Sequence, residues 1–179
     1  MLLKTNFSEK KLVDRCLNND RMAQKELYDK YRCAMYSTVV RLLNNNFDDA
    51  SDVLQEAFIE VFRDLASFKY ISTLGAWIKT IVVRKALLKL RSDKSFEPIT
   101  PEALNQTIEW RDCFTAEYLE KAIQGLPEGT KTIFLLVAVE GLKHKEVAEI
   151  LNISEGTSKS QLNYAKVLLK QKLMDFKND

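Results

Sequence analysis

The sequence predicts an all-α protein built from two small helical domains. Apolar residues recur every three or four positions along most of the 179 residues, while the strict alternation of a β-strand is nearly absent. Glycine and proline are scarce, with 5 and 3 copies respectively. The helical pattern stops between residues 92 and 115, where two of the three prolines stand, and it resumes afterwards.

The first domain is expected over residues 8–95. A helical pattern begins near Leu12, and one apolar face then continues through Leu27, Tyr31, Met35 and Val39. The polar stretch "NNNFDD" at 44–49 interrupts the pattern. Asp48 or Asp49 is expected to cap the next helix, since a short carboxylate accepts a free backbone N–H there. Further helices are predicted over 50–68 and 74–92.

A flexible linker is expected over 96–115 and a second domain over 116–177. The composition of the linker is aperiodic and contains proline, so it cannot bury much area. One helix is predicted to end at Pro127, and the next to end at Gly141, the residue type that favours a helix C-terminus. Two more are predicted over 143–151 and 155–176.

The last two helices form a candidate helix-turn-helix. Val147 and Leu151 give the first helix a narrow apolar stripe, and Ala165 and Leu169 do the same for the second. Asn152 suits the tight turn, and Ser154 suits the N-cap of the second helix. The alternative is a plain helical hairpin with a solvated polar face.

Short or flexible polar side chains follow the turn, and such groups can meet phosphates or base edges in the major groove. The candidate DNA contacts are Ser154, Thr157, Ser158, Lys159, Ser160, Gln161, Asn163 and Lys166. Lys159 is best suited to a phosphate. The Gln161 amide is expected to pair with a base.

Charge is segregated in the first domain, although the net charge is only +2. Asp52, Glu56, Glu60 and Asp64 stand every fourth residue and form an acidic stripe, whereas Leu54, Phe58, Val61, Phe62 and Leu65 are expected in the core. The stripe is either a solvated face or a docking face for a basic partner.

The next helix reverses the sign of the charge. Within residues 79–94 Asp93 is the one acidic residue among the cations Lys79, Arg84, Lys85, Lys89, Arg91 and Lys94. Trp77 precedes them, where its ring could stack on an unpaired base or pack in the core.

Two strings of the sequence resemble the extracytoplasmic-function (ECF) subgroup of the bacterial sigma-70 family. "LPEGTKTIFLLVAVEGLKHKEVAEILNISEGTSKSQLNYAKVLLKQKL" resembles the fourth conserved region of those sigma factors. "DDASDVLQEAFIEVFRDLASF" and "LGAWIKTIVVRKALLKLR" resemble the second region and the segment after it, and "LVDRCLNNDRMAQKELYDKY" resembles the opening of that domain. The blocks cover nearly all of the chain outside the linker, in the order of the family.

The resemblance implies a dissociable promoter-specificity subunit of RNA polymerase. Asp52, Gln55, Glu56 and Phe62 would bind the clamp helices of core polymerase. The loop 69–73 and the basic helix, with Trp77, Lys79, Arg84, Lys85, Lys89 and Arg91, would capture melted minus-ten DNA. The helix-turn-helix would read the minus-thirty-five element. The family usually has an aliphatic residue at Ser158 and arginine at Gln161, and often asparagine at Arg84 and aspartate at Leu88.

The sequence also limits the other functions that we considered. We expect no catalysis, cofactor, metal or small-molecule substrate, because phosphate loops, nucleophile elbows and metal clusters are not found. His144 is the single histidine, and Cys16, Cys33 and Cys113 are expected to be reduced thiols. No apolar run reaches membrane-spanning length and no signal peptide is expected, which predicts a cytoplasmic protein.

A helix-turn-helix and an acidic stripe are also compatible with two alternative functions. A helix-turn-helix regulator would bind DNA without core polymerase. A nucleic-acid-processing enzyme could use Asp52 and Glu56 as metal ligands, but no third ligand is evident. The resemblance also implies an anti-sigma factor as a further partner.

Overall fold

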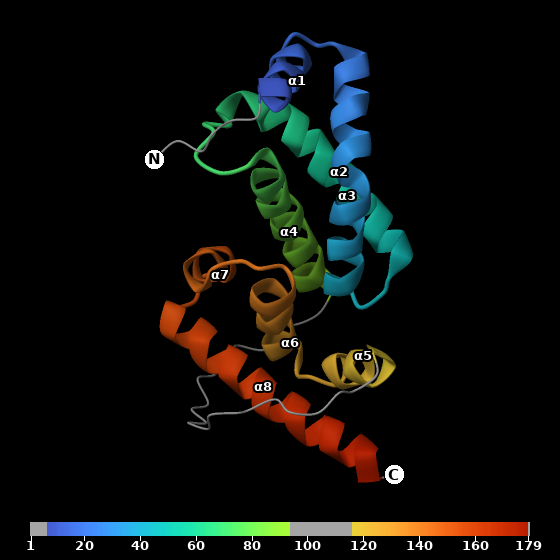
Figure 1. Ribbon diagram of the computed structural model, residues 1–179, viewed down its shortest axis with the longest axis vertical. Coiled ribbons are helices and arrows are strands. Elements are labelled where there is room, and N and C mark those ends of the chain that lie inside the picture. Colours follow the sequence, from blue (N-terminus) through green and yellow to red (C-terminus); the bar gives the residue numbers. More distant parts are fainter. Residues whose placement is uncertain (1–6, 94–115, 179) are drawn as a thin grey trace. The chain divides into compact units, whose positions relative to one another are not determined.

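The structure is a computed structural model that describes residues 7–93 and 116–178. Every regular element in these two ranges is a helix, so the prediction of an all-α protein is confirmed. The chain divides into two compact units, Met1–Lys94 and Ser95–Asp179 (Figure 1). The linker expected at 96–115 lies outside the described residues, and each unit is described by itself.

The first unit consists of α1 (Phe7–Leu17), α2 (Arg21–Leu42), α3 (Phe47–Asp64), the 3₁₀ turn η1 (Leu65–Ser67) and α4 (Leu74–Asp93). Helices α2, α3 and α4 pack against one another, and α1 packs on α2. Their shared core contains Leu27, Val39, Val61, Ile78 and Val82, all fully buried. These residues follow the helical periodicity of the sequence.

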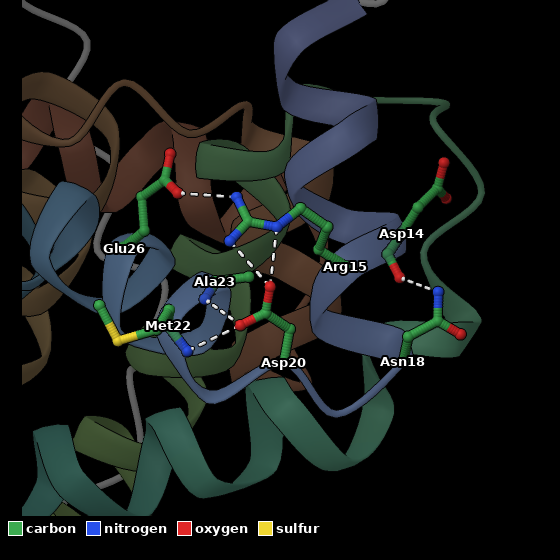
Figure 2. Close-up of polar contacts among 7 residues, drawn as sticks. All are labelled: Asp14, Arg15, Asn18, Asp20, Met22, Ala23 and Glu26. Atoms are coloured by element: carbon green, nitrogen blue, oxygen red, sulfur yellow. Dashed lines mark hydrogen bonds and ion pairs between the residues drawn. The ribbon is translucent and has the colours of Figure 1, made fainter.

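The joint between α1 and α2 is held by Asp20, the N-cap residue of α2 (Figure 2). Its carboxylate accepts hydrogen bonds from the backbone N–H groups of Met22 and Ala23 at 2.9 and 3.1 Å, and from Nε of Arg15 at 2.8 Å. Arg15 also reaches the Glu26 carboxylate at 3.3 Å. The backbone hydrogen bond from Ala23, followed by the Arg15 guanidinium, lowers the pKa of Asp20.

The start of α3 differs from the prediction. Asn46 is the N-cap residue, because its side-chain oxygen accepts the backbone N–H of Asp49 at 3.2 Å. The prediction that Asp48 or Asp49 would cap this helix is therefore wrong. Both carboxylates lie in the first turn of α3, where they favour the helix by interacting with its positive end.

The second unit consists of α5 (Ala116–Gln124), α6 (Glu128–Phe134), the π-helical turn η2 (Leu135–Val139), α7 (His144–Leu151) and α8 (Glu155–Asn178). Helices α5, α6 and α7 all pack against α8. Ala165, Leu169 and Leu173 of α8 form the core with Ala122 and Leu126. The long helix α8 is thus the element on which the other helices of this unit assemble.

Candidate nucleic-acid interface

Helices α7 and α8 form a helix-turn-helix with a three-residue turn, 152–154. Asn152 ends α7 in the left-handed region, with φ 56°, and its backbone N–H donates to the Ala148 carbonyl. Asparagine tolerates this conformation better than most residues. Ser154 Oγ accepts the backbone N–H of Thr157 at 2.9 Å, so the predicted N-cap of α8 is confirmed.

One face of α8 presents polar side chains outward. Lys159 is exposed, while Asn163 and Lys166, which follow at spacings of four and three, are half-buried. Lys159 lies 3.7 Å from the Glu155 carboxylate on the preceding turn. Ser160 is half-buried, and its hydroxyl donates to the Thr157 carbonyl at 3.0 Å. This face contains the side chains of α8 that are suited to phosphates and base edges.

Two of the predicted DNA contacts lie on the opposite side of α8. Ser158 is 0% exposed and Gln161 is 4% exposed. Thr130 of α6 donates its hydroxyl to Gln161 Oε1 at 2.7 Å, and Nδ1 of His144 lies 2.8 Å from Ser158 Oγ. The prediction that these two side chains face DNA is therefore wrong. The Gln161 amide and the Ser158 hydroxyl both turn toward the domain core.

His144 begins α7 and is half-buried against α8. Burial is the main reason that the pKa of His144 is lowered, and the positive charges of Lys159 and Lys166 lower it further, against the opposing effect of Glu155. The neutral imidazole is therefore favoured in the folded domain. A neutral ring can serve either as donor or as acceptor toward Ser158.

In the first unit, α3 presents an exposed face that includes Asp52, Gln55 and Glu56. Ile59 continues this face at a spacing of seven from Asp52 and is 68% exposed. Phe62 is half-buried, with its ring 6.2 Å from that of Phe58. Ile59 was not among the contacts predicted from the sequence. Its position outside the apolar stripe of α3 was the signal that could have identified it.

The acidic stripe of α3 does not remain on one surface. Glu60 turns toward α4, where Lys85 Nζ lies 3.2 Å from its carboxylate and 3.8 Å from that of Glu56. One turn along, Lys89 Nζ lies 3.1 Å from the Asp49 carboxylate. An open cleft of about 340 Å³ between α3 and α4 is lined by Asp49, Glu56, Lys85 and Lys89, together with the exposed Asp52 and Leu88. The acidic stripe and the basic helix therefore partly neutralise each other.

Asp64, the last residue of α3 and of the acidic stripe, does not join these pairs. It forms an ion pair with Arg63, whose Nε lies 2.8 Å from its carboxylate.

A different face of α4 is open. Its residues are Trp77, Arg84, Leu88 and Arg91, which follow one another at spacings of seven, four and three and so share one side of the helix. Arg84, Leu88 and Arg91 are exposed. Leu88 is 60% exposed. Lys79 is half-buried and lies on another side of the helix. Of the six predicted minus-ten contacts, the structure thus brings three onto one exposed face, while Lys85 and Lys89 lie against α3.

Trp77 is linked to the loop before α4. Its ring is half-buried, and the centroid lies 5.5 Å from that of Phe68, which in turn lies 4.6 Å from Tyr70. Tyr70 has a φ of 56°, an uncommon conformation for an aromatic residue. The ring of Trp77 thus packs against Phe68 while the residue is only half-buried, and its stacking on an unpaired base stays a prediction.

Across residues 7–93 and 116–178, no group of three or more histidine, cysteine, aspartate or glutamate side chains is placed to hold a metal ion. In the same ranges, no helix combines the length and the apolar character that crossing a membrane requires.

Comparisons with known proteins match both units in order. The family described as "Sigma-70 region 2" matches residues 27–96, and "Sigma-70, region 4" matches residues 116–169. The ECF RNA polymerase sigma-E factor of Haemophilus influenzae is 29% identical over 183 residues, covering 93% of this chain and 96% of the relative. The ECF RNA polymerase sigma factor SigM of Mycobacterium tuberculosis is 28% identical over 167 residues, covering 90% and 83%.

Solved structures agree in fold. The sigma factor RpoE, solved in complex with the anti-sigma factor NepR from Bartonella quintana, matches with a TM-score of 0.60 and 20% identity, covering 84% of this chain and 96% of that one. CnrH, solved in complex with the cytosolic domain of CnrY, matches with a TM-score of 0.58 and 20% identity, covering 92% and 95%. Both family regions are present in order, and ECF sigma factors match this chain over most of their own length. The chain therefore belongs to the ECF subgroup of the sigma-70 family of RNA polymerase sigma factors.

Proposed function

We propose that this sigma factor binds core RNA polymerase through the exposed face of α3, binds melted minus-ten DNA with the exposed face of α4, and reads the minus-thirty-five element with α8. The observation that carries the proposal is the presence of three separate polar faces on a chain that matches both sigma regions. A regulator that binds DNA alone needs the face on α8 and leaves the other two without a role.

The polymerase contact is assigned to Asp52, Gln55, Glu56 and Ile59. An exposed Ile59 surrounded by polar side chains suits the centre of a protein interface, where apolar groups contribute most of the binding energy. The carboxylates at its edge suit a basic partner and would accelerate association. Phe62, half-buried beside Phe58, supports this face from below.

The minus-ten contact is assigned to Trp77, Arg84 and Arg91. Arginines bind phosphates, and an accessible aromatic ring stacks on an unpaired base. Lys85 and Lys89 are secondary candidates, because DNA would have to compete with Glu60 and Asp49 for them.

The minus-thirty-five contact is assigned to the outward face of α8. Lys159 suits a phosphate, and Asn163 is the amide best placed to read a base. Ser154, Thr157, Ser160 and Lys166 flank these two residues and would contact the backbone.

The same assignment defines the setting in which the protein works. We propose that it catalyses no reaction itself and acts in the cytoplasm, where promoter DNA and polymerase are found. We also propose an anti-sigma partner, because RpoE and CnrH, which share the fold, were each solved with another protein chain bound.

The experiment that tests the polymerase contact is a pull-down of core RNA polymerase by the purified chain. Asp52→Lys should weaken binding, because it places a positive charge where a basic partner docks. Asp14→Lys, the same charge change at an exposed site on α1, is the matched control and should bind like the parent. Equal core binding by the parent and Asp52→Lys would refute the assignment of α3.

A further inference from the structure

The first two turns of α8 contain two buried polar side chains in its apolar stripe. Ser158 and Gln161 stand three residues apart, and Ala165 and Leu169 continue the same side of the helix into the core. A hydroxyl or an amide in such a position costs stability unless it is hydrogen-bonded. Each of these side chains must therefore depend on a partner in the domain.

The two partners come from two different helices. Thr130, itself 5% exposed, is in the first turn of α6, and its hydroxyl donates to Gln161 Oε1 at 2.7 Å. His144 is the first residue of α7, and its Nδ1 lies 2.8 Å from Ser158 Oγ. One turn of α8 is thus attached by polar bonds to α6 on one side and to α7 on the other.

Such bonds restrain rotation of α8 about its own axis more tightly than apolar contacts do. Side-chain tips lie ~5 Å from a helix axis, so a rotation of ~15° moves them by ~1.3 Å. Where that movement runs along the bond, a bond of 2.7 or 2.8 Å lengthens to about 4 Å, beyond the hydrogen-bonding range. Apolar side chains could accommodate the same rotation by small shifts, because their contacts have no preferred direction.

We propose that the Thr130–Gln161 and His144–Ser158 pairs set the rotation of α8, and so determine which base pair Asn163 meets in the minus-thirty-five element. Gln161 and Ser158 are positioning residues and act on specificity without touching DNA. The inference rests on the proposed function, in which the outward face of α8 enters the major groove.

The matched variants are Thr130→Val and Thr132→Val. Both remove a buried hydroxyl from α6 by the same near-isosteric change, but the Thr132 hydroxyl donates within its own helix, to the Glu128 carbonyl at 2.9 Å. Only Thr130→Val therefore releases α8. Thr130→Ser keeps the hydroxyl and should restore the parent behaviour.

The measurement is a selection from a library of minus-thirty-five elements by the full chain with core polymerase, followed by affinities for the selected element and its single-base variants. For Thr130→Val, the preference between bases at one or two positions should change by about 5- to 150-fold, the range that one base contact supplies. Thr132→Val and Thr130→Ser should keep the preference of the parent. Ser158→Ala removes the hydrogen bond to His144 and should also change the preference between bases. This variant replaces Thr130→Val in the test if Thr130→Val does not fold.

Three results would overturn the inference. If Thr130→Val and Ser158→Ala weaken binding to all elements by the same factor, the pairs contribute stability alone. If the parent chain selects no minus-thirty-five element, the proposed function of α8 fails and the inference fails with it. A parent that selects an element while every folded variant selects the same one would overturn the inference and leave the proposed function intact.

Discussion

The ion pair between Glu60 of α3 and Lys85 of α4 allows the stability of the first unit to be separated from its binding function. The variants to compare are Glu60→Lys and Asp52→Lys, which change the charge of α3 equally. Glu60 lies 3.2 Å from Lys85, and both side chains are roughly 70% covered. Asp52 is exposed at the open cleft beside α4, and no ion pair joins it to Lys85. We therefore expect only Glu60→Lys to destabilise the fold.

The expected loss of unfolding free energy follows from the distance between Glu60 and Lys85 and from their partial burial. At 3.2 Å, the Coulomb attraction is about 1.3 kcal/mol in water and about 5 kcal/mol at an effective dielectric constant of 20. Measured exposed pairs contribute about 0.2–1 kcal/mol, because ordering of the side chains offsets the attraction. For this partly covered pair, losing the attraction should cost about 1 kcal/mol, and Glu60→Lys, which adds repulsion, about 2 kcal/mol.

The assay is urea unfolding followed by the fluorescence of Trp77, with Trp110 replaced by Phe in every variant, so that the signal comes from the first unit. Glu60→Lys, Lys85→Glu and the double exchange form a double-mutant cycle. The double exchange should recover most of the lost stability, because opposite charges again face each other. A coupling energy below about 0.3 kcal/mol, within the usual error of additivity, would refute this account of the α3–α4 contact.

Further predictions concern the second unit. Ser154→Ala should lower the free energy of unfolding by about 1 kcal/mol, since it removes the N-cap of α8. Ser154→Asp should retain most of the parent's stability, because aspartate can also cap a helix. Equal thermal stability of the Ala and Asp variants would contradict the capping role. The free energy of unfolding should fall as the pH drops below about 6.5, because the unfolded chain binds a proton at His144 more readily than the folded domain. Urea midpoints measured over a pH series should show this fall for the parent and a smaller fall for His144→Gln. Lys159→Ala should weaken binding to all promoter sequences. It should also reduce the slope of log affinity against log salt concentration by about 1, whereas an unchanged slope would place Lys159 away from a phosphate.

The helices and their order could be predicted from the sequence because local signals define them. The period of apolar residues located the core faces, and Gly141, Asn152 and Ser154 marked helix ends by conformational preference or capping. The cap of α3 was missed because "NNNFDD" offers several capping residues in a row, and only the backbone geometry selects Asn46.

The candidate site was less predictable, since its polar groups are sorted by partners far along the chain. Gln161 bonds Thr130, which is 31 residues away. Its spacing from Ala165 and Leu169 placed it in the apolar stripe of α8, but its polar amide pointed instead to a contact with DNA. The same holds for Lys85 and Lys89, which local charge placed with the DNA-binding cations. Their contacts with α3 arise only when two helices pack.

The central claim is that this chain directs core RNA polymerase to a promoter, and run-off transcription tests it most directly. Core polymerase should produce a discrete transcript from a selected promoter only when the parent chain is added. Asp52→Lys should reduce that transcript, because the chain docks more weakly on the enzyme. The account would be contradicted if the parent chain bound the promoter equally tightly with and without core polymerase and gave no transcript.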